Sequence, residues 1–129
     1  MAAHTRKLSV ALVSVLLACN ALAGWTPLRT TARGIDYIDT EPLAVERNLR
    51  RVSTLTDLAR PDSDGDRAYR TLLEIDCNNT IYRSIESAFF AEPMASGKST
   101  ARTDSASPWR QVQAGSAAAA VMKLVCAKP

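Results

Sequence analysis

The chain has 129 residues, of which 47% are hydrophobic and 22% are charged, and its formal net charge is +3. This length suits one domain with a modest core and leaves no room for a second domain of ordinary size. The single histidine, His4, lies near the amino terminus. Histidine-dependent catalytic triads and the commonest transition-metal ligand are therefore excluded from the rest of the chain.

The amino terminus has the pattern of a secretory signal peptide. Arg6 and Lys7 precede an apolar run, and Ala21-Leu22-Ala23 places small residues at the spacing of a cleavage site. The apolar run is too short to cross about 30 Å of hydrocarbon as a helix, so we expect no transmembrane span. We predict a signal peptide over residues 1–23 and one exported domain over residues 24–129.

A second route of processing stays open, because the segment from Leu16 to Cys19 also fits a lipoprotein box. Lipidation of Cys19 would anchor the protein at the outer membrane, whereas cleavage after Ala23 would leave it without an anchor. After cleavage at Ala23, 14 basic and 13 acidic side chains remain, a formal charge of +1. The electrostatic argument for binding nucleic acid is then lost.

Two cysteines, Cys77 and Cys126, belong to the exported domain. An even number of cysteines in an exported chain predicts a disulfide, here between Cys77 and Cys126. Such a disulfide would close a loop of 49 residues, which stabilises a domain by roughly 4 kcal/mol in the chain-entropy model. The pairing also removes a free thiol as a nucleophile.

Alternation of apolar and polar side chains predicts most of the strands. The clearest are Tyr69 to Cys77 and Ile81 to Phe90, and Asn78-Asn79 between them predicts a hairpin with a two-residue turn at positive φ. A loop over 61–66 precedes this hairpin. Gly97 to Thr103 adds one more short strand.

The amino-terminal part of the domain predicts two further strands. Pro27 lies inside an extended segment over 25–31, which suits an edge strand because proline has no amide donor. After a turn at Arg33-Gly34, a short strand over 35–39 is expected to end at Thr40-Glu41-Pro42. The segment from Leu49 to Leu58 is ambiguous, because its period favours a helix and its composition favours a strand.

The carboxyl-terminal segment predicts the helix. Ser116 is a suitable cap for an alanine-rich run that ends at Cys126. Val121 and Val125 lie one turn apart, as do Met122 and Cys126, so the helix has an apolar face with its cysteine on or beside it. The disulfide would then attach this helix to the strand that ends at Cys77.

Three groups of acidic residues are candidate sites. Asp62-Ser63-Asp64-Gly65-Asp66 has the spacing of the first ligands of an EF-hand, but Arg67 and Leu73 occupy the places of the required glycine and glutamate, which favours a solvated turn. The pairs Asp36 with Asp39 and Glu74 with Asp76 are better interpreted as the polar face of a half-buried sheet than as acid/base pairs.

No residue is therefore predicted to be catalytic, to bind a cofactor or to bind a metal, and we expect a protein that is not an enzyme. The two tryptophans of the domain, Trp25 and Trp109, are expected in the core or at its edge, because few other large apolar side chains are present.

The order of the features above resembles the surface-adhesin protein E-like family of small exported bacterial proteins. The residues that carry the resemblance are Tyr37-Ile38-Asp39, the run from Leu49-Arg50-Arg51-Val52 to Leu55-Thr56-Asp57, Glu74-Ile75-Asp76-Cys77, Tyr82-Arg83, Pro93-Met94, Gly97-Lys98, Pro108-Trp109, Gly115-Ser116 and Cys126. The first half departs from the family, with Ser53 where an aromatic residue is frequent and a poor match over 40–48.

The resemblance implies an α+β fold, a mostly antiparallel sheet of about five or six strands packed against one C-terminal helix and tied to it by the two cysteines. It also implies that Leu49 to Leu58 is a strand. The function it implies is attachment to host extracellular-matrix or serum proteins, at the outer-membrane surface. The alternative is a periplasmic or lipid-anchored accessory protein of the envelope without adhesin activity; in both cases the partners are proteins, and a dimer is compatible with the resemblance.

Overall fold

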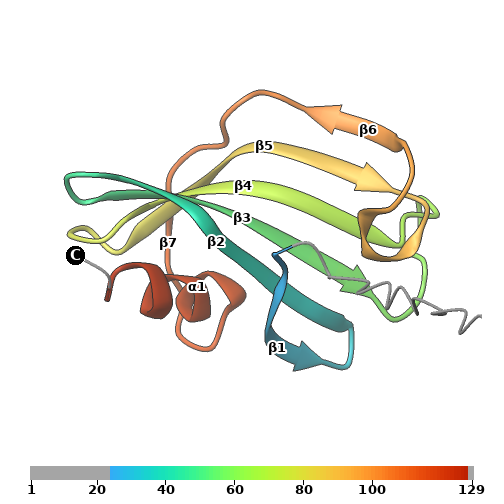
Figure 1. Cartoon of the computed structure of the whole chain (residues 1–129), viewed down its shortest axis with the longest axis horizontal. Helices are drawn as coiled ribbons and strands as arrows, with labels where there is room; N and C mark the ends of the chain where they lie inside the picture. Colours follow the sequence, from blue (N-terminus) through green and yellow to red (C-terminus); the bar gives the residue numbers. More distant parts are fainter. Residues whose placement is uncertain (1–23, 128–129) are drawn as a thin grey trace, which may run out of the picture.

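The computed structural model describes residues 24–127 (Figure 1). The expected signal peptide and the lipidation candidate Cys19 lie outside the described residues. The elements are β1 (Thr26–Thr31), β2 (Gly34–Glu46), β3 (Leu49–Leu58), β4 (Ala68–Asp76), β5 (Ile81–Phe90), the 3-10 turn η1 (Pro93–Ala95), β6 (Ser99–Thr103), β7 (Arg110–Gln111) and α1 (Ala117–Val125).

The strands form one antiparallel sheet in the order β1-β2-β3-β4-β5-β6, and the short β7 pairs with the start of β5. Consecutive strands are therefore neighbours from β1 to β6, whereas β7 returns to pair with β5. The β2–β3 and β4–β5 turns lie at the end of the sheet near α1, whereas η1 and the β3–β4 loop lie at the opposite end (Figure 1). This architecture confirms the α+β prediction of a sheet with one C-terminal helix.

Apolar side chains on the two faces of the sheet form two separate clusters. On the face that α1 covers, Ile38, Val52 and Ile75 pack with Val121 and Val125 of the helix. The cluster on the opposite face consists of Tyr37, Leu55, Ala68, Ala88 and Phe90, with Trp25 and Met94 packed against it. The sheet is thus buried on one face near the helix and on the other face near η1.

Helix α1 is held at both ends by specific contacts. At its start, Ser116 Oγ accepts a hydrogen bond of 3.1 Å from the amide of Ala119, as predicted for the cap. At its end, the buried Arg50 donates from Nε to the carbonyl of Val125 at 3.2 Å. The guanidinium of Arg50 gives a hydrogen-bond donor to a helix-end carbonyl that has no partner within the helix, and its charge complements the negative end of the helix dipole.

The disulfide between Cys77 and Cys126 is confirmed, with a Cα–Cα distance of 5.7 Å. Cys77 directly follows β4 and Cys126 is the C-cap of α1, so the bridge attaches the helix to the sheet. The predicted strand from Leu49 to Leu58 is also confirmed as β3, which removes the ambiguity between helix and strand.

Two local predictions were wrong. Strand β2 does not end at Thr40-Glu41-Pro42: its register with β3 shifts between Asp39 and Ala44, and pairing then resumes through Glu46. An irregularity of this kind lets one strand tolerate residues that ordinarily interrupt a ladder.

The β4–β5 turn also differs from the prediction, because positive φ falls on Thr80 and not on either asparagine. Residues 77–80 form the loop, and the carboxylate of Asp76 accepts hydrogen bonds from the amides of Asn78 and Asn79. Asp76 therefore organises the turn that the two asparagines were expected to form by themselves.

Candidate functional site

The sheet face opposite α1, which we call the open face, is ordered by the strand register. Residues paired across an antiparallel sheet share a face, so each row of partners crosses the open face from β2 to β5 or β6. The five rows are Glu46, Leu49, Asp76 and Ile81; Ala44, Arg51, Glu74 and Arg83; Asp39, Ser53, Leu72 and Glu86; Tyr37, Leu55, Arg70, Ala88 and Arg102; and Ile35, Asp57, Ala68, Phe90 and Ser99.

Only one end of the open face is covered within residues 24–127. There Asp57 accepts a hydrogen bond of 2.6 Å from the amide of Met94, which holds η1 over the apolar row that contains Phe90. The rows toward the β4–β5 turn carry charged side chains instead. This charged part of the open face is the candidate site.

A groove of about 310 Å³, which we call the central groove, lies in the middle of the open face. Its lining combines cations, anions and apolar groups: Trp25, Asp39, Ser53, Arg70, Leu72, Glu86 and Arg102. Arg70 also lies over the ring of Phe90, with its guanidinium carbon 5.7 Å from the ring centroid. A groove with charges of both signs beside an indole suits a polypeptide better than a polyanion.

A second group of side chains, the arginine–tryptophan cluster, consists of Arg51, Glu74, Arg83 and Trp109. Glu74 is 2% exposed, and each of its carboxylate oxygens accepts hydrogen bonds from one arginine. The closest contacts are 2.7 Å from Arg51 Nε to Glu74 Oε2 and 2.7 Å from Arg83 Nη2 to Glu74 Oε1. The guanidinium of Arg83 also lies over the ring of Trp109, with its central carbon 4.5 Å from the ring centroid.

Burial alone would raise the pKa of Glu74, but the hydrogen bonds from Arg51 and Arg83 outweigh it and hold this pKa below its ordinary value. Glu74 is therefore ionised at neutral pH and cannot serve as a general acid. Two guanidiniums and one carboxylate leave the cluster with an excess of positive charge.

Glu74 and Asp76 were interpreted as the polar face of a half-buried sheet. They do share one face of β4, but both are buried, so this face is not an outer polar surface at these two positions. The pKa of Asp76 is lowered, first by its hydrogen bond from the Asn79 side chain. Each carboxylate is thus occupied by a structural partner of its own. The two do not form an acid/base pair.

Asp36 and Asp39 fall on opposite faces of β2. The carboxylate of Asp36 pairs with Arg29 at 2.8 Å, and Asp39 accepts a hydrogen bond from the amide of Glu41. Their separation follows from the two-residue period of a strand and the odd number of steps between them. They do not form an acid/base pair either.

The two tryptophans differ from each other. Trp25 packs at the edge of the apolar cluster on the open face, as predicted. Trp109, which is 38% exposed, is not part of the core, contrary to the prediction. Its ring is held by Arg83 instead, so the indole stays partly in contact with solvent.

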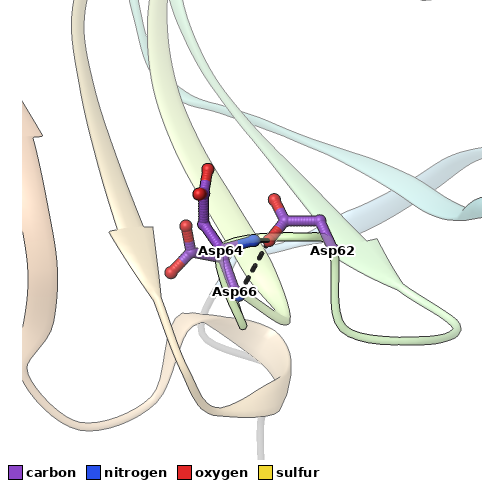
Figure 2. Close-up of side chains that lie close together, drawn as sticks. All are labelled: Asp62, Asp64 and Asp66. Carbon is purple, nitrogen blue, oxygen red and sulfur yellow. Dashed lines mark hydrogen bonds between the residues drawn. The ribbon is translucent and has the colours of Figure 1, made fainter.

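The aspartates of the β3–β4 loop come close together but are already engaged within the loop. Ligand oxygens of Asp62, Asp64 and Asp66 lie within 4.8 Å of one another. Figure 2 shows that one carboxylate oxygen of Asp62 accepts hydrogen bonds from the amides of both other residues. Its second oxygen accepts from the hydroxyl of Tyr69, the largest of several contacts that lower the pKa of Asp62. These contacts agree with the interpretation of the segment as a turn.

The family model of surface-adhesin protein E matches residues 25–127. The chain belongs to the surface-adhesin protein E family. Solved structures of protein E from Haemophilus influenzae are similar to it: crystal form II has a TM-score of 0.63 and 16% identity, covering 81% of this chain and 88% of that one. Protein E from non-typeable Haemophilus influenzae has a TM-score of 0.59 and 16% identity, covering 81% and 76%. No curated protein sequence matches the chain.

Membership of the surface-adhesin protein E family has two direct consequences. The family is one of exported binding proteins and not of enzymes. At 16% identity, the solved protein E structures establish the shared fold and no individual ligand contact.

Residues 24–127 contain no helix with the length and hydropathy needed to cross a membrane.

Sequence reasoning missed the arginine–tryptophan cluster, although the predicted hairpin contained the signal for half of it. A turn centred between Asn78 and Asn79 places Glu74 directly opposite Arg83, as the structure does. Cross-strand partners of opposite charge predict an ion pair. The contributions of Arg51 and Trp109 depend on the β3–β4 register and on a loop, neither of which the local pattern contains.

Proposed function

We propose that this protein is an exported surface adhesin that binds protein partners through the open face and performs no chemistry on them. The observation that carries the proposal is the uneven covering of the sheet. Helix α1 covers one face, whereas the central part of the other face is left with exposed arginines and a groove lined by side chains of both charges. Host extracellular-matrix and serum proteins are the partners that we propose.

Family membership supports a binding role, and the chemistry of the open face supports protein as the ligand. Arginine and tryptophan are the side chains most enriched where protein interfaces gain their affinity. The charges of both signs that line the central groove favour partners with a complementary pattern.

Capture by immobilised matrix and serum proteins tests this proposal. The mature domain should be retained at micromolar concentration or below, and reversing the charge of Arg70 and Arg102 together should weaken capture at least tenfold. Lys123, exposed on α1, offers a matched control: Lys123→Glu should bind like the parent protein. No capture by any protein in the panel would remove the adhesin function.

We further propose that residues 1–23 are removed as a signal peptide and that the domain faces the cell exterior. The family match begins at residue 25, directly after this segment, which supports the boundary. Intact-mass analysis of the mature protein distinguishes an amino terminus at Gly24 from an acylated Cys19. Protease treatment of intact cells should degrade a surface-exposed domain, whereas survival of the domain would favour a periplasmic envelope protein.

A further inference from the structure

The arginine–tryptophan cluster has the features of a preorganised carboxylate site. Arg51 and Arg83 are both fixed by the buried Glu74, so their orientation is set before any ligand arrives. Fixing a long side chain in advance lowers the entropic cost that binding otherwise incurs. A ligand carboxylate can bind here only if these guanidiniums retain unused hydrogen-bond donors.

Both arginines have unused donors. Arg51 is bonded through Nε, and its side chain is 53% exposed. Arg83 uses Nε and Nη2 for Glu74 and is 31% exposed. Among residues 24–127, the terminal nitrogens of Arg51 and the Nη1 nitrogen of Arg83 have no hydrogen-bond partner, so they remain able to donate to a ligand carboxylate.

Trp109 adds an apolar surface beside these donors. Among residues 24–127, the other aromatic side chains are buried or half-buried and Trp109 alone is exposed, and its contact with Arg83 fixes the ring. An indole that is both exposed and held in place offers contact area at little entropic cost. A ligand with a carboxylate next to an apolar or aromatic group matches the two parts of the cluster.

The side chains around the cluster favour a polypeptide over a polyanionic polysaccharide as the ligand. Glu46 borders the hollow beside Arg51, and Glu86 lies in the next row of the open face. A chain of closely spaced sulfates would meet these carboxylates and be repelled, whereas one or two carboxylates on a polypeptide can reach the arginines alone.

We propose that the arginine–tryptophan cluster binds an acidic segment of a partner protein, with a Glu or Asp carboxylate on Arg51 and Arg83 and an adjacent apolar side chain on Trp109. This deepens the proposed function and rests on it for the biological partner, but the cluster can be tested with a defined probe. The cluster and the central groove then act as two parts of one binding face.

The probe is a short synthetic peptide of glutamates and tyrosines, with a matched peptide in which glutamine replaces each glutamate. Nuclear magnetic resonance follows the indole N–H of Trp109, assigned from Trp109→Phe. The acidic peptide should shift this signal in a saturable way that weakens at high salt, and the glutamine peptide should not.

Three variants locate the contact. Isothermal titration calorimetry compares the variants, because Trp109→Ala has no indole signal to follow. Arg51→Gln and Trp109→Ala should each weaken binding of the acidic peptide about five- to tenfold, equivalent to about 1 kcal/mol or slightly more. Arg60→Gln changes an exposed arginine of the β3–β4 loop, which lies at the opposite end of the sheet (Figure 1), and this variant should bind like the parent protein. Trp109→Ala keeps the ion pairs of Glu74 with Arg51 and Arg83, so weaker peptide binding by this variant would not result from a loss of folding.

Each alternative outcome has a distinct meaning. Equal binding of the two peptides, or binding unaffected by both variants, would overturn the carboxylate site. Tighter binding of a sulfated oligosaccharide at Trp109 than of the acidic peptide would overturn the choice of a protein ligand. Peptide binding without capture by any matrix or serum protein would support the cluster and contradict the proposed function, so the two failures are distinguishable.

Discussion

Cys77, the residue after β4, is bonded to Cys126, the residue that caps the end of α1. The helix is nine residues long and contains four alanines, so by itself it is too short to be stable in water. Its order depends on docking through Val121 and Val125, on the guanidinium of Arg50 and on this bridge.

Replacing Cys126 with serine should therefore loosen the helix before the sheet. We expect the free energy of unfolding to fall by about 4 kcal/mol and amide exchange to accelerate from Ala117 to Ala127. The β4–β5 hairpin should remain the better protected part. Hydrogen exchange with mass spectrometry measures both regions, and uniform acceleration across the sheet would show that the bridge stabilises the domain as a whole.

Substitution of Glu74 by glutamine should remove the negative charge that Arg51 and Arg83 share, and it replaces one acceptor oxygen with an NH2 group. We expect a loss of about 2 kcal/mol in the free energy of unfolding at pH 7, because a charge-assisted contact is lost from each arginine. Glu86→Gln, an exposed carboxylate one row away, is the matched control and should change stability by less than about 0.5 kcal/mol.

The effect of Glu74→Gln should also depend on pH in a definite direction. The folded protein holds the pKa of Glu74 below its ordinary value, so the stabilisation is fully present above the unfolded pKa of about 4.3 and is lost as pH falls through the folded pKa. Denaturant unfolding from pH 3 to 7 should show the parent and the variant converging only in acid. A difference that stayed constant down to pH 3 would contradict the ion-pair account.

The cap at Ser116 makes its own contribution to the stability of α1. Ser116→Ala removes the acceptor for the amide of Ala119 and should cost about 1 kcal/mol, with the loss confined to α1. Ser116→Asp keeps an acceptor and adds a favourable charge at the helix start, but it loses the 2.6 Å hydrogen bond from the serine hydroxyl to the carbonyl of Gln113. Its stability should therefore lie between that of Ser116→Ala and that of the parent. Thermal unfolding of the three proteins distinguishes a capping contribution from a general effect of changing the loop.

Gly34, at the start of β2, is required by close packing of two backbones. A Cβ atom there would lie 2.1 Å from the carbonyl oxygen of Asp57, which neither strand can avoid without moving. Gly34→Ala should therefore destabilise the domain by about 3 kcal/mol. Gly65→Ala, where the same atom meets open space at a φ of +83°, should cost only about 1 kcal/mol of backbone strain.

The elements that were predicted correctly are those whose information is local. The alternation from Tyr69 to Cys77, the serine before the alanine-rich run and the even number of cysteines each depend on a physical rule that spans a few residues or one covalent bond. The segment from Leu49 to Leu58 was different, because its period favoured a helix and its composition favoured a strand. The resemblance to a family indicated the strand.

Three of the errors share one cause, which is that the deciding contact lies outside the local segment: these are the burial of Glu74, the exposure of Trp109 and the end of β2. The β4–β5 turn is different, because the Asp76 contacts that set it are local. Glu74 is buried because Arg51 reaches it from the neighbouring strand, and Trp109 stays exposed because Arg83 holds its ring in a loop. Strand β2 continues past Pro42 because β3 offers a partner on both sides of the irregularity. No local pattern contains these partners, so the candidate site was less predictable than the fold.

The most direct measurement of the central claim is oxidative side-chain footprinting of the domain bound to a matrix or serum protein that captures it. Trp109 and Leu124 are exposed to similar extents, 38% and 44%, but Trp109 belongs to the open face and Leu124 to α1. The open-face account predicts that the bound partner lowers oxidation of Trp109 and leaves Leu124 unchanged. Protection of Leu124 with unchanged oxidation of Trp109 would contradict it.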